Sequence, residues 1–174
     1  MIRVAVTGAE STGKSTLAAR LAAHFGAPLS PEFARAYAER AGRPLTADDV
    51  EPIARGQRDA EDRAVLRADG DLVILDTDLL STGVYATFYY GRCPAWIGDA
   101  TRMRRPALYL LCDPAGVSWT ADPVRASAAD RELLHGQFAA AVRASGAPIC
   151  WLRGPADDRL LSAIVAIQAL RERP

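Results

Sequence analysis

The sequence predicts an α/β sandwich whose central parallel sheet has about five strands and is flanked by helices. Three observations support this fold class. Short apolar runs alternate along the chain with longer segments whose apolar residues recur at helical spacing. The run at 72–75 is wholly apolar, as in a parallel strand covered on both faces. A glycine-rich loop directly follows the first apolar run, at 2–6.

Length and charge narrow the function classes. A chain of 174 residues is long enough for one domain with a real core, so we expect a single domain spanning 1–174. Basic and acidic side chains balance at 21 each, so nothing indicates nucleic acid or an anionic membrane as a partner, and a small-molecule substrate fits better. No run has the length of a membrane span and no signal peptide is recognisable, so we expect a cytoplasmic protein. The sequence does not indicate an oligomeric state.

The strongest motif is the segment 8–16, which fits the phosphate-loop pattern G-x-x-x-x-G-K-[ST]. In this pattern, backbone N–H groups and the amino end of the following helix bind phosphates. Lys14 is the only lysine of the chain, and we expect it to reach the β- and γ-phosphates of ATP while the Ser15 hydroxyl binds Mg²⁺. The motif and the parallel sheet together predict the three-layer sandwich of P-loop NTPases. The predicted ATP-phosphate residues in this loop are Gly8, Glu10, Ser11, Thr12, Gly13, Lys14, Ser15 and Thr16.

Two helices are expected after this loop. Leu17, Leu21 and Phe25 recur at helical spacing and predict the first, which ends before Gly26. The segment 27–30 then reads as a short strand or connector. Proline at a first helical position predicts a second helix over 31–41. This helix carries Glu32 and Arg35 in its first turns, near the carboxyl edge of the preceding strand, so both are candidate substrate-binding residues.

A third helix is expected over 46–68, and Gln57 falls on its apolar face. A buried amide costs free energy unless it is hydrogen-bonded. Gln57 is therefore either a satisfied structural residue or part of a ligand pocket, and the sequence leaves both possibilities open.

The apolar strand at 72–75 ends in Asp76-Thr77-Asp78. Asp76 is the candidate for the acidic residue that accompanies a phosphate loop and helps to hold hydrated Mg²⁺. Asp78 is expected to point from the strand end towards the substrate. The alternative for Asp76 is that it starts a turn and caps the next helix.

The segment 79–91 is rich in aromatic residues, and Tyr85 and Tyr89 share a helix face. Such rings either build the core or enclose a flat ligand ring. A short helix from Pro94 to Arg102 and a buried strand at 107–112 are expected to follow.

A lid is expected at 117–131, because this segment lacks a clean period and carries Asp122, Arg125 and Arg131. In a phosphoryl-transfer protein, such arginines close over the transferring phosphate. The alternative is that they are solvated side chains. The predicted helix through Arg131 is followed by a strand at 148–152 and a last helix at 157–170.

The classes of P-loop protein can be separated by two absences. A GTPase normally reads guanine with Asn-Lys-x-Asp, which a chain with one lysine does not supply. A motor-type or AAA-type ATPase usually has glutamate directly after the acidic-strand aspartate, and here that residue is Thr77. Both absences favour a small-molecule kinase, in which a substrate hydroxyl is the nucleophile and a lid excludes water.

A set of motifs occurs in a fixed order: Gly8-Ala9-Glu10-Ser11-Thr12-Gly13-Lys14-Ser15-Thr16, Pro31-Glu32-Phe33-Ala34-Arg35, Gly56-Gln57, Asp76-Thr77-Asp78, Tyr90-Gly91, and the segment from Trp119 to Arg125. In order and spacing over nearly the entire chain, this set resembles the ribosylnicotinamide kinase domain of NadR-type bacterial proteins. The resemblance implies transfer of the ATP γ-phosphate to the 5′-hydroxyl of nicotinamide riboside, which yields nicotinamide mononucleotide.

The resemblance also implies roles for the candidate residues. Either Glu32 or Asp78 accepts the hydroxyl proton or holds the ribose, and Lys14 with Arg125 stabilises charge on the transferring group. The candidates to stack on or contact the substrate are Gln57, Tyr85, Tyr89, Trp119 and Asp122.

This sequence departs from the family in two ways. NadR-type proteins carry the kinase domain behind a nucleotidyltransferase domain, and we expect only the kinase domain here. The lid has Pro123 where glycine is expected, which predicts a stiffer hinge. Two alternatives remain: a kinase of another nucleoside or vitamin-like alcohol, and a non-catalytic ATP-binding regulatory module.

Overall fold

In the computed structural model, which describes residues 1–117 and 130–172, five parallel strands form one sheet in the order β2-β3-β1-β4-β5. This confirms the predicted fold class and sheet. Each central strand is wholly or largely buried, which explains why its sequence is apolar without alternation. The strands are β1 (Ile2–Thr7), β2 (Leu29–Ser30), β3 (Leu72–Asp76), β4 (Leu108–Cys112) and β5 (Ile149–Leu152).

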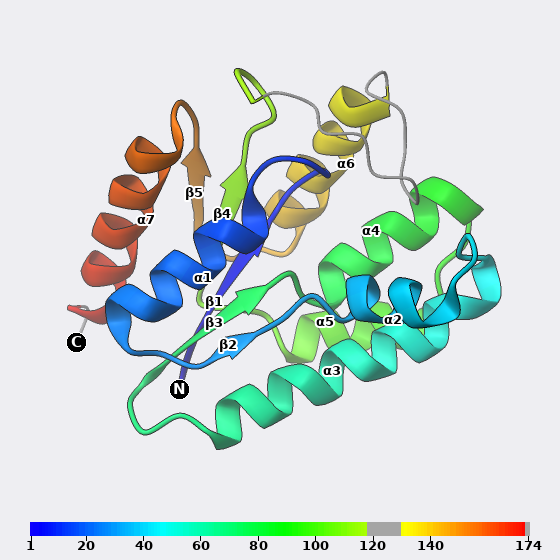
Figure 1. The fold of residues 1–174 in the computed structure, drawn as a ribbon, viewed down its shortest axis with the longest axis horizontal. Coiled ribbons are helices and arrows are strands. Elements are labelled where there is room, and N and C mark those ends of the chain that lie inside the picture. The colour runs from blue at the N-terminus through cyan, green and yellow to red at the C-terminus, as the bar shows by residue number, and fades with distance from the viewer. Residues whose placement is uncertain (118–129, 173–174) are drawn as a thin grey trace.

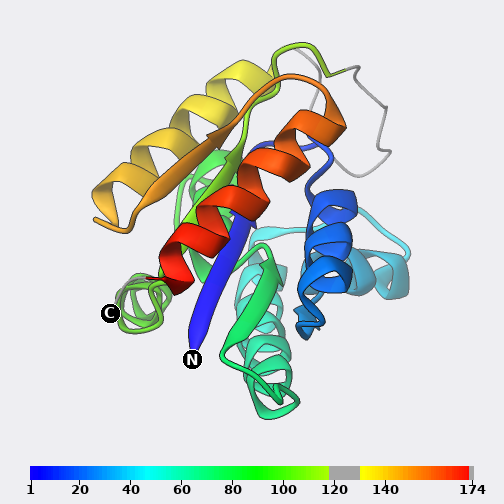
Figure 2. The ribbon, with the colours of Figure 1, turned by 90° about the vertical axis from the view of Figure 1, so that its left-hand side faces the viewer.

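Helices lie on both faces of the sheet, which gives three layers (Figures 1 and 2). The helices α1 and α7 cover one face, and α4 and α6, with the end of α3, cover the other. The described helices are α1 (Lys14–Phe25), α2 (Phe33–Ala41), α3 (Val50–Leu66), α4 (Leu79–Tyr90), α5 (Ala95–Met103), α6 (Asp130–Ala144) and α7 (Ala156–Arg171), with a 3₁₀ turn, η1 (Ala47–Asp49), before α3.

Alternate strand residues divide the core between the two faces. Val4 and Ile74 pack with the side chains of α1 and α7, whereas Ala5, Leu75 and Tyr109 pack with those of α4 and α6. A third, smaller apolar cluster joins α3, α4 and α5. The helices of residues 1–117 and 130–172 include none that is long and apolar enough to span a membrane.

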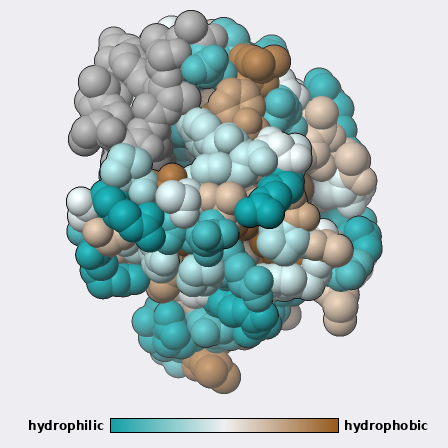
Figure 3. Space-filling model, turned by 90° about the vertical axis from the view of Figure 1, so that its right-hand side faces the viewer, coloured by the Kyte–Doolittle hydropathy of each residue, from teal (hydrophilic) through white to brown (hydrophobic). Residues whose placement is uncertain are grey.

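The register of the sheet sets the position of the site. Val6 of β1 pairs with Asp76 of β3, and the Thr77 N–H donates to the Val6 carbonyl at 3.0 Å. The loop after β1 and the acidic turn after β3 therefore lie side by side at the carboxyl edge of the sheet, where open α/β sheets bind ligands. The face of the molecule on the side of α2 and α4 is mostly hydrophilic, with apolar atoms in small separate patches (Figure 3).

Candidate active site

The loop between β1 and α1 has the backbone conformation that its motif predicts. Gly8 has φ +133°, and a Cβ there would lie 2.7 Å from the Cys112 carbonyl oxygen of β4. Only glycine allows this close approach. Ser11 and Gly13 also have positive φ, of 53° and 80°. The loop thus turns sharply before α1, with the amino end of a helix at its base.

Internal hydrogen bonds hold the loop in shape. The Thr12 hydroxyl and the Lys14 ammonium both donate to the Ala9 carbonyl, each at 2.8 Å. From outside the loop, the Arg131 guanidinium donates to the Ser11 carbonyl at 2.9 Å and to the Val117 carbonyl at 2.9 Å. Burial lowers the pKa of Arg131. Arg131 is therefore a buried side chain that supports the loop backbone, and not a solvated arginine.

Asp76 lies at the end of β3, beside the start of α1. It is buried, and its Oδ1 has no hydrogen-bond partner among the described residues. Burial raises the pKa of Asp76, and the Ser15 hydroxyl and the Lys14 ammonium oppose that rise. An unpartnered carboxylate oxygen next to a serine hydroxyl fits Mg²⁺, which proteins usually hold with one or two groups while phosphates and water complete the shell.

Asp78 has a different environment from Asp76. Its Oδ1 accepts the Ser81 N–H at 3.2 Å at the start of α4, and its Oδ2 accepts the Tyr109 hydroxyl at 2.7 Å. Burial raises the pKa of Asp78. Both oxygens are engaged and Asp78 does not line the cavity described below. The helix-capping contact that the sequence offered as an alternative for Asp76 is therefore made by Asp78.

Thr77 separates these two carboxylates and has φ 68°, a conformation that non-glycine residues rarely adopt. Gln57 meets it from α3. The Gln57 amide donates to the Thr77 carbonyl at 3.3 Å and accepts the Phe33 N–H at 2.9 Å, at the start of α2. A Cβ at Gly56 would lie 2.1 Å from the Phe33 ring, so glycine is needed for this packing. Gln57 is thus hydrogen-bonded at both ends, as a structural residue would be, and it also lines the cavity described below.

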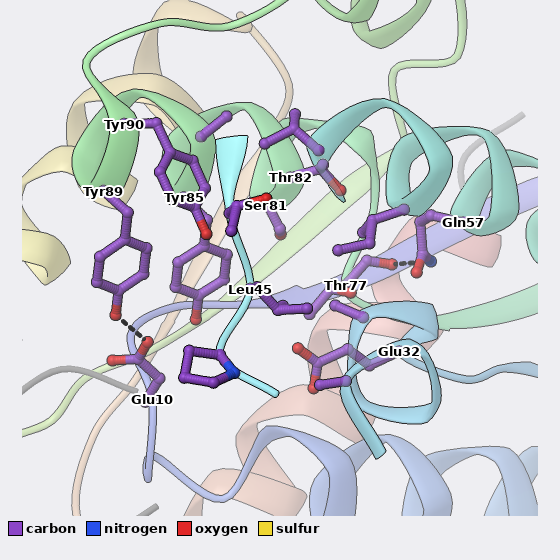
Figure 4. Close-up of a pocket in the computed structure, with 17 residues that line it drawn as sticks. Glu10, Glu32, Leu45, Gln57, Thr77, Ser81, Thr82, Tyr85, Tyr89 and Tyr90 are labelled. Carbon is purple, nitrogen blue, oxygen red and sulfur yellow. Dashed lines mark hydrogen bonds between the residues drawn. The ribbon is translucent and has the colours of Figure 1, made fainter. Parts of the chain in front are cut away.

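A cavity of about 390 Å³ lies next to the phosphate loop, between α2, α3 and α4 (Figure 4). Two carboxylates line it, Glu10 from the loop and Glu32 from the start of α2. Tyr85, Tyr89 and Tyr90 contribute aromatic rings from α4. The segment between α2 and α3 forms a further wall through Pro44, Leu45 and Thr46, and it is held by a two-pronged ion pair from Arg43 to Asp49, with N–O distances of 2.7 and 2.8 Å.

Glu32 and Arg35 are close but differ in exposure. Their charged atoms are 3.8 Å apart, and the side chain of Glu32 is 4% exposed whereas that of Arg35 is 55% exposed. Glu32 lines the cavity and Arg35 does not. The structure therefore brings Glu32, and not Arg35, to the cavity wall.

The two tyrosines that the sequence singled out lie side by side on α4 and differ in what they pack against. Their rings are nearly parallel, with centroids 6.1 Å apart. Tyr85 also packs edge-on against Phe138 in the core, at 5.2 Å, and both tyrosines line the cavity. Tyr89 donates its hydroxyl to Glu10 at 2.6 Å, a contact that the sequence analysis missed (Figure 4).

On the opposite side of the phosphate loop lies a groove of about 360 Å³, lined by loop residues and by the turn before α7. Arg159 forms part of its wall. This buried guanidinium donates to the carbonyls of Gly154, Asp113 and Thr12 at 2.7, 2.8 and 3.2 Å. Arg159 was not among the predicted site residues, because no local sequence pattern separates it from the other arginines.

Trp119, Asp122, Pro123 and Arg125, which the sequence places in a lid, lie outside the described residues. Within residues 1–117 and 130–172, no cluster of three His, Cys, Asp or Glu side chains could hold a metal ion by itself.

Several solved structures resemble this chain in fold. Two structures of NadR protein, one in complex with NAD and AMP-PNP and one in complex with NR, are 28% identical to this chain, with a TM-score of 0.77. The match covers 99% of this chain but only 50% and 52% of theirs, so this chain spans about half the length of those proteins.

More distant structures share the fold alone. Thymidylate kinase from Ehrlichia chaffeensis is 14% identical, with a TM-score of 0.68 over 97% of this chain and 98% of its own. Deoxyadenosine kinase from M. mycoides with bound dATP is 12% identical, with a TM-score of 0.64 over 97% of this chain and 100% of its own. The sheet, the phosphate loop and these likenesses together define a P-loop kinase fold.

No curated protein sequence matches the chain. A family model described as an AAA domain does match, over residues 3–159, which is most of the chain. The chain therefore belongs to this family, AAA_28, a family of P-loop domains.

Proposed function

We propose that this protein is an ATP-dependent kinase that phosphorylates the 5′-hydroxyl of nicotinamide riboside to give nicotinamide mononucleotide. The observation that carries the proposal is the cavity beside the phosphate loop, in which a buried carboxylate, Glu32, and three tyrosines surround a space of about 390 Å³. A cavity of this size fits a small nucleoside. The likeness to NadR in complex with NR supports the acceptor, and the likeness to NadR with AMP-PNP supports the donor.

ATP is assigned to the groove and the loop. The nucleoside part would occupy the groove between the phosphate loop and the turn before α7, and the phosphates would lie on the loop residues 8–16. Lys14 would contact the β- and γ-phosphates and balance charge that develops on the transferring group. Ser15 and Asp76 would hold Mg²⁺, which when bound would supply positive charge that stabilises the transferring phosphate.

Glu32 is the proposed base. In the transfer step, the acceptor hydroxyl oxygen bonds to the γ-phosphorus while the bond to the β–γ bridging oxygen breaks, ADP leaves with the electron pair, and the hydroxyl proton passes to Glu32. Glu32 is preferred to Asp78 because it lines the cavity, whereas both oxygens of Asp78 accept hydrogen bonds from Tyr109 and Ser81.

The remaining roles extend the site around the acceptor. Gln57 would orient the acceptor, and Tyr85 and Tyr89 would stack on or flank the pyridinium ring. Arg35 would act through its ion pair with Glu32. We keep Trp119, Asp122 and Arg125 as lid residues of the proposed enzyme, with Arg125 as a second cation on the transferring phosphate.

A second candidate function is ATP hydrolysis, which the family description of an AAA domain favours. Hydrolysis needs a group that orients water beside the γ-phosphate. The position after Asp76 is Thr77, whose carbonyl accepts the Gln57 amide. A threonine there lacks the carboxylate that an ATPase of this class usually uses, so transfer to an alcohol is preferred.

The test is product formation by the purified protein from nicotinamide riboside and Mg·ATP. We expect equal amounts of nicotinamide mononucleotide and ADP, with both lost in Lys14→Ala and Asp76→Ala. ADP formed without a phosphorylated acceptor would favour hydrolysis. If another nucleoside or a vitamin-like alcohol is phosphorylated in place of the riboside, the protein is a kinase but the proposed acceptor is wrong. No turnover above the Lys14→Ala background would contradict the proposal.

A further inference from the structure

The cavity carries an unusual charge for a site beside bound phosphates. Of the described residues that line it, Glu10 and Glu32 are charged, and none is a lysine, arginine or histidine. Both carboxylates are buried, with exposed fractions of 1% for Glu10 and 7% for Glu32. Placing two buried carboxylates next to a site that binds a polyanion costs free energy, unless a cation compensates.

Glu10 belongs to the phosphate loop itself, where an acidic side chain would repel ATP if it faced the phosphates. The structure turns it to the cavity side instead. Its Oε1 accepts the Tyr89 hydroxyl at 2.6 Å, which ties the loop to α4 across 79 positions of sequence (Figure 4). Its Oε2 is buried and has no hydrogen-bond partner among the described residues. This oxygen retains the capacity to interact with a positive charge.

The aromatic neighbours of Glu10 favour the same kind of ligand. The rings of Tyr85 and Tyr89 are nearly parallel, at an angle of 5°, and both line the cavity. Aromatic faces attract cations, and do so more strongly where water is excluded. Carboxylate and ring faces thus act together on a flat cationic ring, whereas a neutral ring would leave the charge of Glu10 uncompensated.

We propose that Glu10 is a specificity-determining residue that selects an acceptor with a positively charged ring over a neutral ring of the same shape. The inference rests on the proposed function, because the acceptor named there contains a pyridinium. It goes further in assigning the selection to one carboxylate of the phosphate loop. In this arrangement the loop would bind the donor through its backbone and the acceptor through the Glu10 side chain.

The test uses nicotinamide riboside and its reduced form, which has the same ribose and carboxamide but a neutral dihydropyridine ring. We compare the ratio of kcat/KM for the cation to kcat/KM for the neutral form in the unmodified protein, in Glu10→Gln and in Glu39→Gln. Glu39 is an exposed glutamate of α2 that does not line the cavity, so Glu39→Gln is the matched control. We expect the ratio to fall about tenfold in Glu10→Gln and to stay constant in Glu39→Gln.

A purely structural role for Glu10 would lower both values of kcat/KM equally, and an unchanged ratio in Glu10→Gln overturns the inference. A second measurement does not depend on turnover. Calorimetry with 1-methylnicotinamide, a cation without an acceptor hydroxyl, and with neutral nicotinamide should show a preference for the cation that Glu10→Gln removes. If that preference is present while neither riboside is phosphorylated, the proposed function fails and the role of Glu10 stands. If the unmodified protein shows no preference for the cation, the inference fails.

Discussion

The two sides of the phosphate loop differ in the groups that form them: backbone groups on the groove side and side chains on the cavity side. The groove side is organised by backbone carbonyls, which Arg159 and Arg131 gather with charge-assisted hydrogen bonds. The cavity side is organised by side chains: two carboxylates, an amide and three tyrosines. A backbone site is suited to phosphates, which every NTP shares, whereas a side-chain site can change with each substitution. In the proposed enzyme, the fold would therefore fix donor binding, and a few side chains would determine acceptor choice.

Loss of the Lys14 ammonium is expected to have the largest effect, because its proposed role is to contact the β- and γ-phosphates of ATP. We expect Lys14→Ala to reduce kcat about 10³-fold. Lys14→Arg should restore little of this, since a planar guanidinium does not replace a compact ammonium. Steady-state kinetics with nicotinamide riboside measure the loss. A variant within tenfold of the unmodified protein would contradict the role given to Lys14.

On the cavity side, Glu32→Gln is expected to reduce kcat about 10²-fold through loss of the base, while ATP affinity is retained. Asp78→Asn is the informative comparison. Its main effect should be on the free energy of unfolding, because Asp78 caps α4 and accepts the Tyr109 hydroxyl. Kinetics and urea unfolding of both variants separate the two roles. A larger kcat loss in Asp78→Asn, measured on folded protein, would make Asp78 the base.

On the groove side, Arg159→Met is expected to raise KM for ATP about tenfold and to leave KM for the acceptor nearly constant. The variant loses charge-assisted hydrogen bonds to three carbonyls, which frees the Thr12 end of the loop. Arg171→Met is the control, since Arg171 is on the same helix but pairs with Asp71 at the surface. Equal changes in both KM values would show that the two sides are not separable.

The smallest expected effect concerns the pH dependence of stability and a buried carboxyl outside the cavity lining. Glu61 of α3 is buried, pairs with Arg104 at 3.1 Å, and has a pKa raised by burial from 4.5 to about 7. The folded protein thus holds a proton on Glu61 that the unfolded chain releases near its ordinary pKa. This favours folding at low pH, and the contribution is lost as pH rises towards 7.

Glu61→Gln should therefore flatten the dependence of the unfolding free energy on pH between about pH 4.5 and 7. Urea unfolding at several pH values measures this slope, with Glu39→Gln as the exposed control. An unchanged slope in Glu61→Gln would mean that the Arg104 pair keeps Glu61 ionised in the folded protein.

A structural feature can be predicted from the sequence when the contacts that form it join residues close together along the chain. The sheet, the order of the helices and the phosphate loop follow from apolar spacing and from one short motif, and the structure confirms them. The loop could be predicted because glycines and a single lysine determine its backbone over nine adjacent residues.

The parts that could not be predicted depend on distant partners. Glu10 meets Tyr89 across 79 positions, and Asp78 meets Tyr109 across 31, so no local spacing reveals either pair. For the same reason the sequence could not rank Glu32 against Asp78, whereas the fold places only one of them in the cavity wall. Tyr85 shows a further limit, since a single ring can pack in the core on one edge and line a site on the other.

The support of the phosphate loop by Arg131 and Arg159 has a consequence for folding. Their guanidiniums bind loop carbonyls that lie 120 and 147 positions earlier in the sequence. Such distant contacts form late and at an entropic cost. The segment 8–16 therefore contains the whole phosphate-loop motif, but its supports form only when α6 and α7 have docked. The shape of the loop is thus a property of the folded chain and not of the motif alone.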